Sequence, residues 1–222
     1  MRVVYHLPLS PFSRKVRLAL KEKGLDFELR AERVWDRRPE FLHLNPAGQV
    51  PVLVEPDGKF FADSWAIVEY LDETYPDRRL IGFDPVSRAE TRRLIAWFDQ
   101  KFYAEVTLNL VFEKVMKRFF GLGNPDSTAI RVGKHNINAH LAYIADLSER
   151  RRWLAGDDFS LADITAASHL SCIDYLGDVP WDAHPRAKDW YVRVKSRPSF
   201  RPLLGDHVAG MPPPPHYADL DF

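Results

Sequence analysis

The sequence predicts an α/β domain followed by an all-helical domain. In the first 76 residues, short apolar runs typical of strands alternate with segments of helical periodicity, in the order β-α-β-α-β-β-α. From Pro85 onward, apolar residues recur only at the three- and four-residue spacing of a buried helix face. The 222 residues suffice for two domains of ordinary size. We expect domains over 1–76 and 85–207, joined by a linker over 77–84.

Each element of the first domain has its own sequence signal. Strands are expected over 2–7 and 27–34, which are rich in β-branched and aromatic residues. Between them, Ser10 is a candidate helix N-cap with Pro11 at the first helical position, and Gly24 ends that helix. The remaining elements are a helical turn over 39–44, a hairpin of 49–54 and 59–62, and a helix over 63–75.

The second domain is predicted to consist of long helices. The first starts at Pro85 and continues to a break near Gly121 to Pro125, and further helices are expected over 130–151, 163–177 and 185–196. The stretch 208–222 contains four consecutive prolines and is predicted to be a projecting tail with few contacts to the core.

Charge and cysteine content argue against several functions. Lys plus Arg and Asp plus Glu both total 31, so no net field favours nucleic acid or an anionic membrane. Cys172 is the only cysteine, which excludes intrachain disulfides and cysteine-rich zinc sites. The eight histidines are scattered and give no metal-binding spacing. No signal-peptide or membrane-spanning apolar run occurs, so we expect a cytoplasmic protein.

Val50 and Pro51 are predicted to be joined by a cis peptide bond. They lie between the turn-forming Asn45-Pro-Ala-Gly48 and an apolar strand, where a proline would remove a ladder hydrogen bond unless it lay at a tight bend or the strand's first position. A cis bond would turn the N–H and C=O of Val50 outward to pair with an extended peptide ligand. The alternative is a trans proline that opens an edge strand.

Four motifs occur in order along the chain: Ser10-Pro-Phe-Ser-Arg-Lys-Val-Arg17, Asn45-Pro-Ala-Gly-Gln-Val-Pro-Val-Leu53, Asp63-Ser-Trp-Ala-Ile67 and Phe159-Ser-Leu-Ala-Asp-Ile164. Together they resemble the glutathione transferase superfamily over nearly the whole chain. The resemblance implies a thioredoxin-like N-terminal domain and the all-α C-terminal domain of that superfamily. In the last motif, Ser160 and Asp163 form a capping box, which we assign to folding.

The resemblance implies a glutathione site in the first domain. Ser10 would donate its hydroxyl to the glutathione thiolate at the positive end of a helix, with Ser13 as the alternative. Ser10 as an N-cap alone is an equally good interpretation. Asp63 and Ser64 would hold the γ-glutamyl end, although Asp63 is one methylene shorter than the Glu or Gln common in the family. The other candidate glutathione contacts are Val50, Pro51, Gln49, Arg37 and Arg38, and the two arginines could instead belong to a solvated loop.

Aromatic residues of the second domain have two interpretations. They could line a pocket for an electrophilic substrate, but aromatic residues at helical spacing are more often core, which we favour. The residues are Tyr103, Phe112, Phe119 and Phe120.

The acidic and aromatic end of the chain, with Trp35 in the loop before the cis-proline motif, resembles a bacterial subgroup of glutathione-transferase-like proteins that bind the division protein FtsZ. The resemblance implies a homodimer that pairs 60–75 with 85–118 and regulates cell constriction at the division site. A tail that folds over the substrate cleft is the alternative. The candidate partner-binding residues are Trp35, Tyr217, Asp219, Leu220, Asp221 and Phe222.

Two functions therefore compete. We favour an FtsZ-binding regulator with weak or no glutathione transferase activity. The alternative is a serine-type glutathione transferase that conjugates glutathione to a small electrophile.

Overall fold

The structure is a computed structural model that describes residues 1–220. The chain divides into two units, Met1–Leu80 and Ile81–Phe222. The division falls inside the stretch 77–84 where a linker is expected.

The first unit is built on a mixed sheet. Its strands are β1 (Arg2–His6), β2 (Phe27–Ala31), β3 (Val52–Val54) and β4 (Phe60–Ala62), in the order β2-β1-β3-β4. β1 pairs in parallel with β2 and antiparallel with β3, and β3 forms the predicted hairpin with β4. Val4 on β1 lies opposite Leu53 on β3, and both side chains are completely buried. This arrangement is the thioredoxin-like sheet that the resemblance implies.

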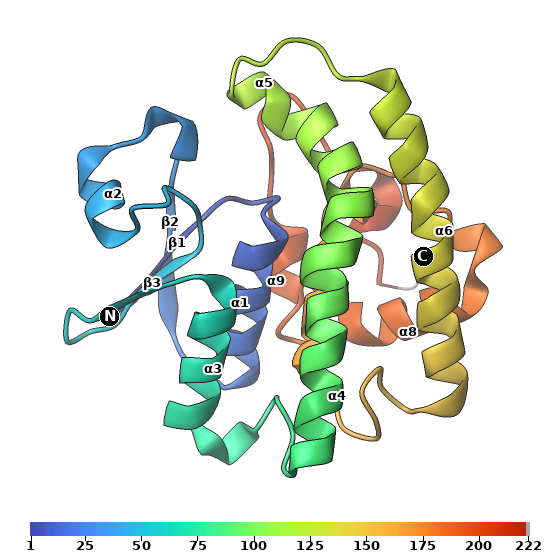
Figure 1. Ribbon diagram of the computed structural model, residues 1–222, viewed down its shortest axis with the longest axis horizontal. Coiled ribbons are helices and arrows are strands. Elements are labelled where there is room, and N and C mark those ends of the chain that lie inside the picture. The colour runs from blue at the N-terminus through green and yellow to red at the C-terminus, as the bar shows by residue number, and fades with distance from the viewer. Residues whose placement is uncertain (221–222) are drawn as a thin grey trace. The chain divides into compact units, whose positions relative to one another are not determined.

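The helices of this unit lie on both sides of the sheet. α1 (Pro11–Glu22) and α3 (Ser64–Thr74) pack side by side on one face, and α2 (Pro39–Leu44) lies on the other (Figure 1). The strand β2 is shorter than predicted because Glu32 turns into the interior and the chain continues as the short helix η1 (Val34–Asp36). A second short helix, η2 (Pro76–Arg78), ends the unit.

Lys23 and Asp72 tie the ends of α1 and α3 together. The Lys23 ammonium lies 2.9 Å from Asp72 Oδ1 and also donates to the carbonyls of Tyr75 and Arg78. Asp72 Oδ1 in turn accepts from the backbone N–H of Leu80 at 2.7 Å. One buried ion pair therefore holds the last turn of each helix and the start of the expected linker.

The second unit is all-helical, as predicted. α4 (Pro85–Ala96) continues without interruption as the π-helix η3 (Trp97–Met116) and the short α5 (Lys117–Phe119). The chain then reverses, and α6 (Ser127–Arg150) runs back beside η3 (Figure 1). Gly133 permits this close approach, because a Cβ atom there would lie 2.8 Å from the Cβ of Asn109. The remaining helices are α7 (Leu161–Tyr175), η4 (Trp181–Ala183), α8 (Pro185–Lys195), α9 (Arg201–Leu204) and η5 (Pro215–Tyr217).

The apolar α7 forms the centre of this unit. Every residue of α7 is buried, including Cys172, whose thiol donates to the carbonyl of Ser168. The predicted capping box is confirmed, since the Ser160 and Asp163 side chains each pair with the other residue's backbone. Within residues 1–220, we find no helix with the length and apolar character needed to cross a membrane.

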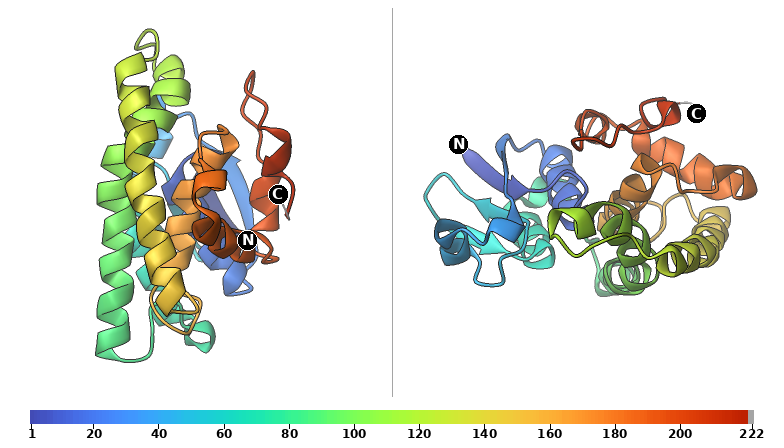
Figure 2. Two further views of the ribbon diagram at one scale, coloured as in Figure 1. Left: turned by 90° about the vertical axis from the view of Figure 1, so that its right-hand side faces the viewer. Right: turned by 90° about the horizontal axis from the view of Figure 1, so that it is seen from above.

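The prediction of a projecting tail is wrong for the described part of 208–222. The segment forms η5 and lies alongside the other C-terminal helices (Figure 2). Tyr217 is completely buried, with its ring 5.2 Å from that of Tyr175. Proline spacing alone suggests a stiff projection, whereas the buried tyrosine fastens the segment to the core. Asp221 and Phe222 lie outside the described residues.

Candidate functional site

Ser10 and Ser13 both lie at the start of α1, in different surroundings. The hydroxyl oxygen of Ser10 accepts a hydrogen bond from the backbone N–H of Ser13 at 3.2 Å, so Ser10 is an N-cap. Its side chain is half-buried and its hydroxyl proton remains available for donation. Ser13 is completely buried, and its hydroxyl has no hydrogen-bond partner within residues 1–220. Ser10 is therefore the more accessible candidate.

The loop before β3 has the backbone geometry that the sequence predicts. The Val50–Pro51 peptide bond is cis. Asn45 braces the loop, because its side-chain amide donates to the carbonyl of Gln49 at 2.8 Å and its side-chain oxygen accepts from the N–H of Ala47. Among the described residues, the N–H and C=O of Val50 take part in no hydrogen bond.

The structure separates the two arginines that the sequence leaves equivalent. Arg38 makes a two-pronged ion pair with the buried Glu32, which raises the pKa of Arg38 through those hydrogen bonds. Arg37 has a left-handed backbone (φ 45°), and its guanidinium passes over Gly48, where a Cβ atom would lie 3.0 Å from Arg37 Nη1. Arg37 forms no ion pair within the described residues, so its charge faces the Asn45 loop uncompensated.

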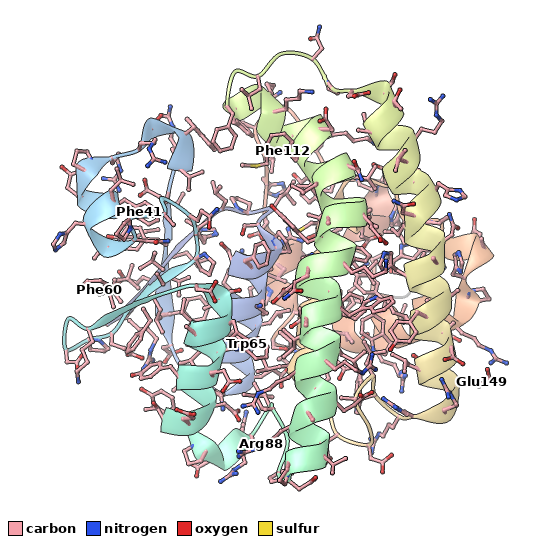
Figure 3. The ribbon with its side chains drawn as sticks, viewed as in Figure 1. Phe41, Phe60, Trp65, Arg88, Phe112 and Glu149 are labelled. Atoms are coloured by element: carbon pink, nitrogen blue, oxygen red, sulfur yellow. The ribbon has the colours of Figure 1, made fainter. Side chains whose placement is uncertain are left out.

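Asp63 and Ser64 begin α3, beside the Trp65 marked in Figure 3. Asp63 adopts a positive φ of 73°, and its Oδ1 accepts from the backbone N–H groups of Trp65 (2.7 Å) and Ala66 (3.2 Å). Asp63 is thus first an N-cap, and only Oδ2 is left over for a ligand. The Ser64 hydroxyl has no hydrogen-bond partner in the described part of the chain, and its position at a helix start suits an anion.

The four aromatic residues of the second unit are not core residues, contrary to expectation. Tyr103, Phe112 and Phe119 are half-buried, and Phe120 is exposed. Burial nonetheless raises the pKa of the Tyr103 hydroxyl. The aromatic core of the long helix is made by Phe98 and Phe102 instead.

The candidate partner-binding residues have different degrees of exposure. Trp35 in η1 is half-buried, with the Arg33 guanidinium 5.9 Å from its ring. Asp219 is exposed and Leu220 half-buried, whereas Tyr217 is inaccessible. Tyr217 is therefore not available as an exposed anchor.

A groove of about 680 Å³ lies next to this end of the chain. One wall comes from η4 and the residues around it, and the other from the C-terminal segment. Its lining consists of Val179, Pro180, Trp181, Asp182, Ala183, Lys188, Pro215, His216 and Asp219.

Sequence reasoning missed the buried polar residues that hold the C-terminal segment. Asp174 and Lys195 are completely buried, and each contacts His216. In the sequence they are ordinary charged residues on predicted helices. The sequence carries no signal of their burial, because other polar residues such as Asp163 and His169 occur on the same predicted helix as Asp174.

Residues 4–79 match the family model of the glutathione S-transferase N-terminal domain, and residues 109–198 match that of the C-terminal domain. The chain belongs to the glutathione S-transferase family. Among residues 1–220, no group of three or more His, Cys, Asp or Glu side chains could hold a metal ion.

The relatives place the chain more narrowly. FtsZ-localized protein A of Caulobacter vibrioides is 50% identical over 224 residues, which cover 100% of this chain and 98% of that protein. The solved structure of FzlA from C. crescentus matches with a TM-score of 0.96 at 50% identity, covering 100% of this chain and 99% of that one. A glutathione S-transferase from Rhodospirillum rubrum F11 matches with a TM-score of 0.98 at 59% identity, covering 100% of both chains. The chain is thus similar throughout its length to an FtsZ-localized protein with the glutathione transferase fold.

Proposed function

We propose that this protein is a homodimeric FtsZ-binding regulator of bacterial cell division, with weak or no glutathione transferase activity. The observation that carries the proposal is the 50% identity to FtsZ-localized protein A over the whole chain. On this proposal the protein acts in the cytoplasm at the division site. Trp35 in the first unit, and Asp219 to Phe222 at the end of the second, are the proposed contacts with FtsZ.

The test is pelleting of the purified protein with FtsZ polymers. We expect pelleting when FtsZ is assembled with GTP and none when FtsZ is kept unassembled with GDP. Leu220→Ala and Trp35→Ala should weaken pelleting, while Leu122→Ala, an exposed residue outside the proposed surface, should not. Equal pelleting with and without polymers would contradict the proposal.

The alternative is a serine-type glutathione transferase. Three observations support a glutathione site: the accessible Ser10 hydroxyl at the start of α1, the unbonded backbone of Val50 and the uncompensated charge of Arg37. Asp63 and Arg38 argue against a strong site, because their side chains already serve the protein's own helix start and ion pair.

Calorimetry with glutathione separates the two functions. We expect weak binding of glutathione, and we expect Arg37→Ala to reduce it. The control is Arg33→Ala, which removes an exposed arginine nearby and should leave the binding unchanged. If instead the protein binds glutathione tightly and conjugates it to a chromogenic electrophile in a reaction that Ser10→Ala slows at least tenfold, the enzyme is the better description.

The proposed dimer pairs 60–75 of one subunit with 85–118 of the other. Apolar side chains are exposed in both stretches, including Phe60 at 44%, Val86 at 78% and Leu108 at 38%. Figure 3 marks Phe60 on the hairpin of the first unit. Light scattering should give the dimer mass at micromolar concentration. Phe60→Glu or Leu108→Glu should shift it to the monomer, whereas Leu122→Glu, at 58% exposure outside both stretches, should not.

A further inference from the structure

The C-terminal segment is fastened to the helical unit by two tyrosines. The Tyr175 hydroxyl accepts from the N–H of Val208 at 2.9 Å and donates to the carbonyl of Met211 at 2.8 Å, which closes the turn before the prolines. The Tyr217 hydroxyl donates to the carbonyl of Leu203 at 3.2 Å, and its ring packs edge-on against that of Tyr175. The segment therefore has a defined position up to Tyr217.

Asp174 lies at the centre of a second set of contacts. Its Oδ1 accepts from Trp181 Nε1 at 2.8 Å and lies 3.2 Å from His216 Nε2, while Oδ2 accepts from the Tyr191 hydroxyl at 3.3 Å. Lys195 adds a hydrogen bond from its ammonium to the carbonyl of His216 at 3.0 Å. A completely buried carboxylate is costly unless it is paired, so the pairing with His216 favours the docked segment.

Burial and pairing act in opposite directions on the ionised groups of this cluster. Burial raises the pKa of Asp174, and the Trp181 hydrogen bond and the charges of Lys195 and His216 oppose that shift. Burial lowers the pKa of Lys195 to about 8, against the attraction of Asp174 and Asp219, so Lys195 remains largely protonated and able to donate at neutral pH.

We propose that Asp174 is a positioning residue of the partner-binding end, in addition to the two tyrosines. By holding His216, it fixes residues 215–217 and hence the point from which Asp219 and Leu220 are presented. Asp174 is buried and does not touch the partner itself. The same contact keeps the wall of the groove formed by Pro215, His216 and Asp219 in place. The inference rests on the proposed function, because it takes this end of the chain to meet FtsZ.

Hydrogen exchange of the full chain tests the anchoring without any partner. Asp174→Asn keeps the shape of the side chain and removes the charge that faces His216 and Lys195. We expect the hydrogen-bonded backbone N–H groups of this segment, those of Val208, Met211 and Tyr217, to exchange about tenfold faster in this variant, with exchange in α6 unchanged. The matched control is Asp178→Asn. Asp178 lies four residues after Asp174, has a side chain that is only 4% exposed, and pairs with Lys114 and Lys134 instead of the C-terminal segment.

Pelleting with FtsZ polymers then tests the role in recognition. Asp174→Asn should raise the apparent Kd about tenfold, and Asp178→Asn should leave it unchanged. His216→Ala removes the same contact from the side of the C-terminal segment. His216 is only half-buried, so this variant provides the test if Asp174→Asn fails to fold. The double variant should bind no more weakly than either single variant, because both remove the same contact.

The outcomes distinguish the anchoring from the proposed function. Unchanged exchange over 208–217 in both Asp174→Asn and His216→Ala would overturn the positioning role, whatever FtsZ does. Faster exchange with unchanged FtsZ affinity would overturn the role in recognition. A wild-type protein that does not pellet with FtsZ would overturn the proposed function and with it the role in recognition, while faster exchange would still support the anchoring.

Discussion

The indole N–H of Trp97 lies 3.1 Å from Nδ1 of His140. An indole can only donate, so Nδ1 of His140 carries no proton and the ring proton resides on Nε2, which faces Glu105 Oε2 at 3.0 Å. The ring of Phe102 packs edge-on against this imidazole at a centroid distance of 4.9 Å. The contact between η3 and α6 therefore requires a neutral His140.

We expect the stability of the helical unit to fall as the pH drops below about 6.5. Burial lowers the pKa of His140, and Glu105 opposes the shift while Lys101 and His169 add to it. As the pH falls, His140 is therefore protonated in the unfolded chain before it is protonated in the folded protein. The stabilisation is present above the pKa of His140 in the unfolded chain and is lost as the pH falls toward its lower pKa in the folded protein. Urea unfolding at pH 7.5 and 5.5 measures the effect.

The variant His140→Gln should show a smaller difference between the two pH values than the wild-type protein. His207→Gln, which removes an exposed histidine, should behave like wild type. His184, whose pKa is also lowered by burial, accounts for part of the dependence that remains. An equal pH dependence in His140→Gln and wild type would refute the assignment.

Asp163→Ala should destabilise the protein by about 3 kcal/mol or more. The buried carboxylate accepts from the N–H groups of Leu154 (3.0 Å) and Ser160 (3.2 Å) and from Trp190 Nε1 (2.9 Å), and the substitution leaves these donors unsatisfied. Ser160→Ala removes only the cap and should cost about 1 kcal/mol. Equal losses in urea unfolding would mean that capping is the whole role of Asp163.

Tyr217→Ala should destabilise the protein by about 3 kcal/mol, because it empties a completely buried aromatic site against Tyr175. Leu220→Ala, three residues later, should change stability by no more than about 0.5 kcal/mol. Thermal unfolding of both variants checks the pair. The same melting temperature in both would support the prediction from the sequence that the end of the chain makes few contacts with the core.

Lys23→Met should cost about 3 kcal/mol, because the buried Asp72 would lose its cation. The carbonyls of Tyr75 and Arg78 would lose their donor at the same time. Lys21→Met, at an exposed position on the same helix, is the control and should be near neutral. Chemical unfolding of the two variants provides the comparison, and a neutral Lys23→Met would show that water replaces the ammonium.

The sequence predicts features that depend on neighbours in the chain. The Ser10 cap, the hairpin of β3 and β4 and the Ser160 capping box each arise from residues a few positions apart. Features that depend on distant contacts could not be predicted. Whether Tyr217 is buried depends on the ring of Tyr175 in another helix, which no local spacing encodes.

The candidate site shows the same division. Arg37 and Arg38 are adjacent and chemically identical in the sequence. They differ in the structure because Glu32 turns inward to bind Arg38, while the left-handed backbone of Arg37 directs its side chain over Gly48. The burial of Asp174 and Lys195 could not be predicted either, because both are charged residues that bind His216 in the C-terminal segment, a contact that no local spacing encodes.

The burial of Cys172 in the centre of α7 has a practical use. The chain has no other cysteine, so its native surface offers no thiol to a maleimide dye or spin label. A single cysteine introduced at an exposed position such as Asp219 could be labelled selectively in the otherwise natural protein. Fluorescence anisotropy of such a probe would report directly on whether the end of the chain is held or released. Cys172 would not have to be replaced first, because it is buried.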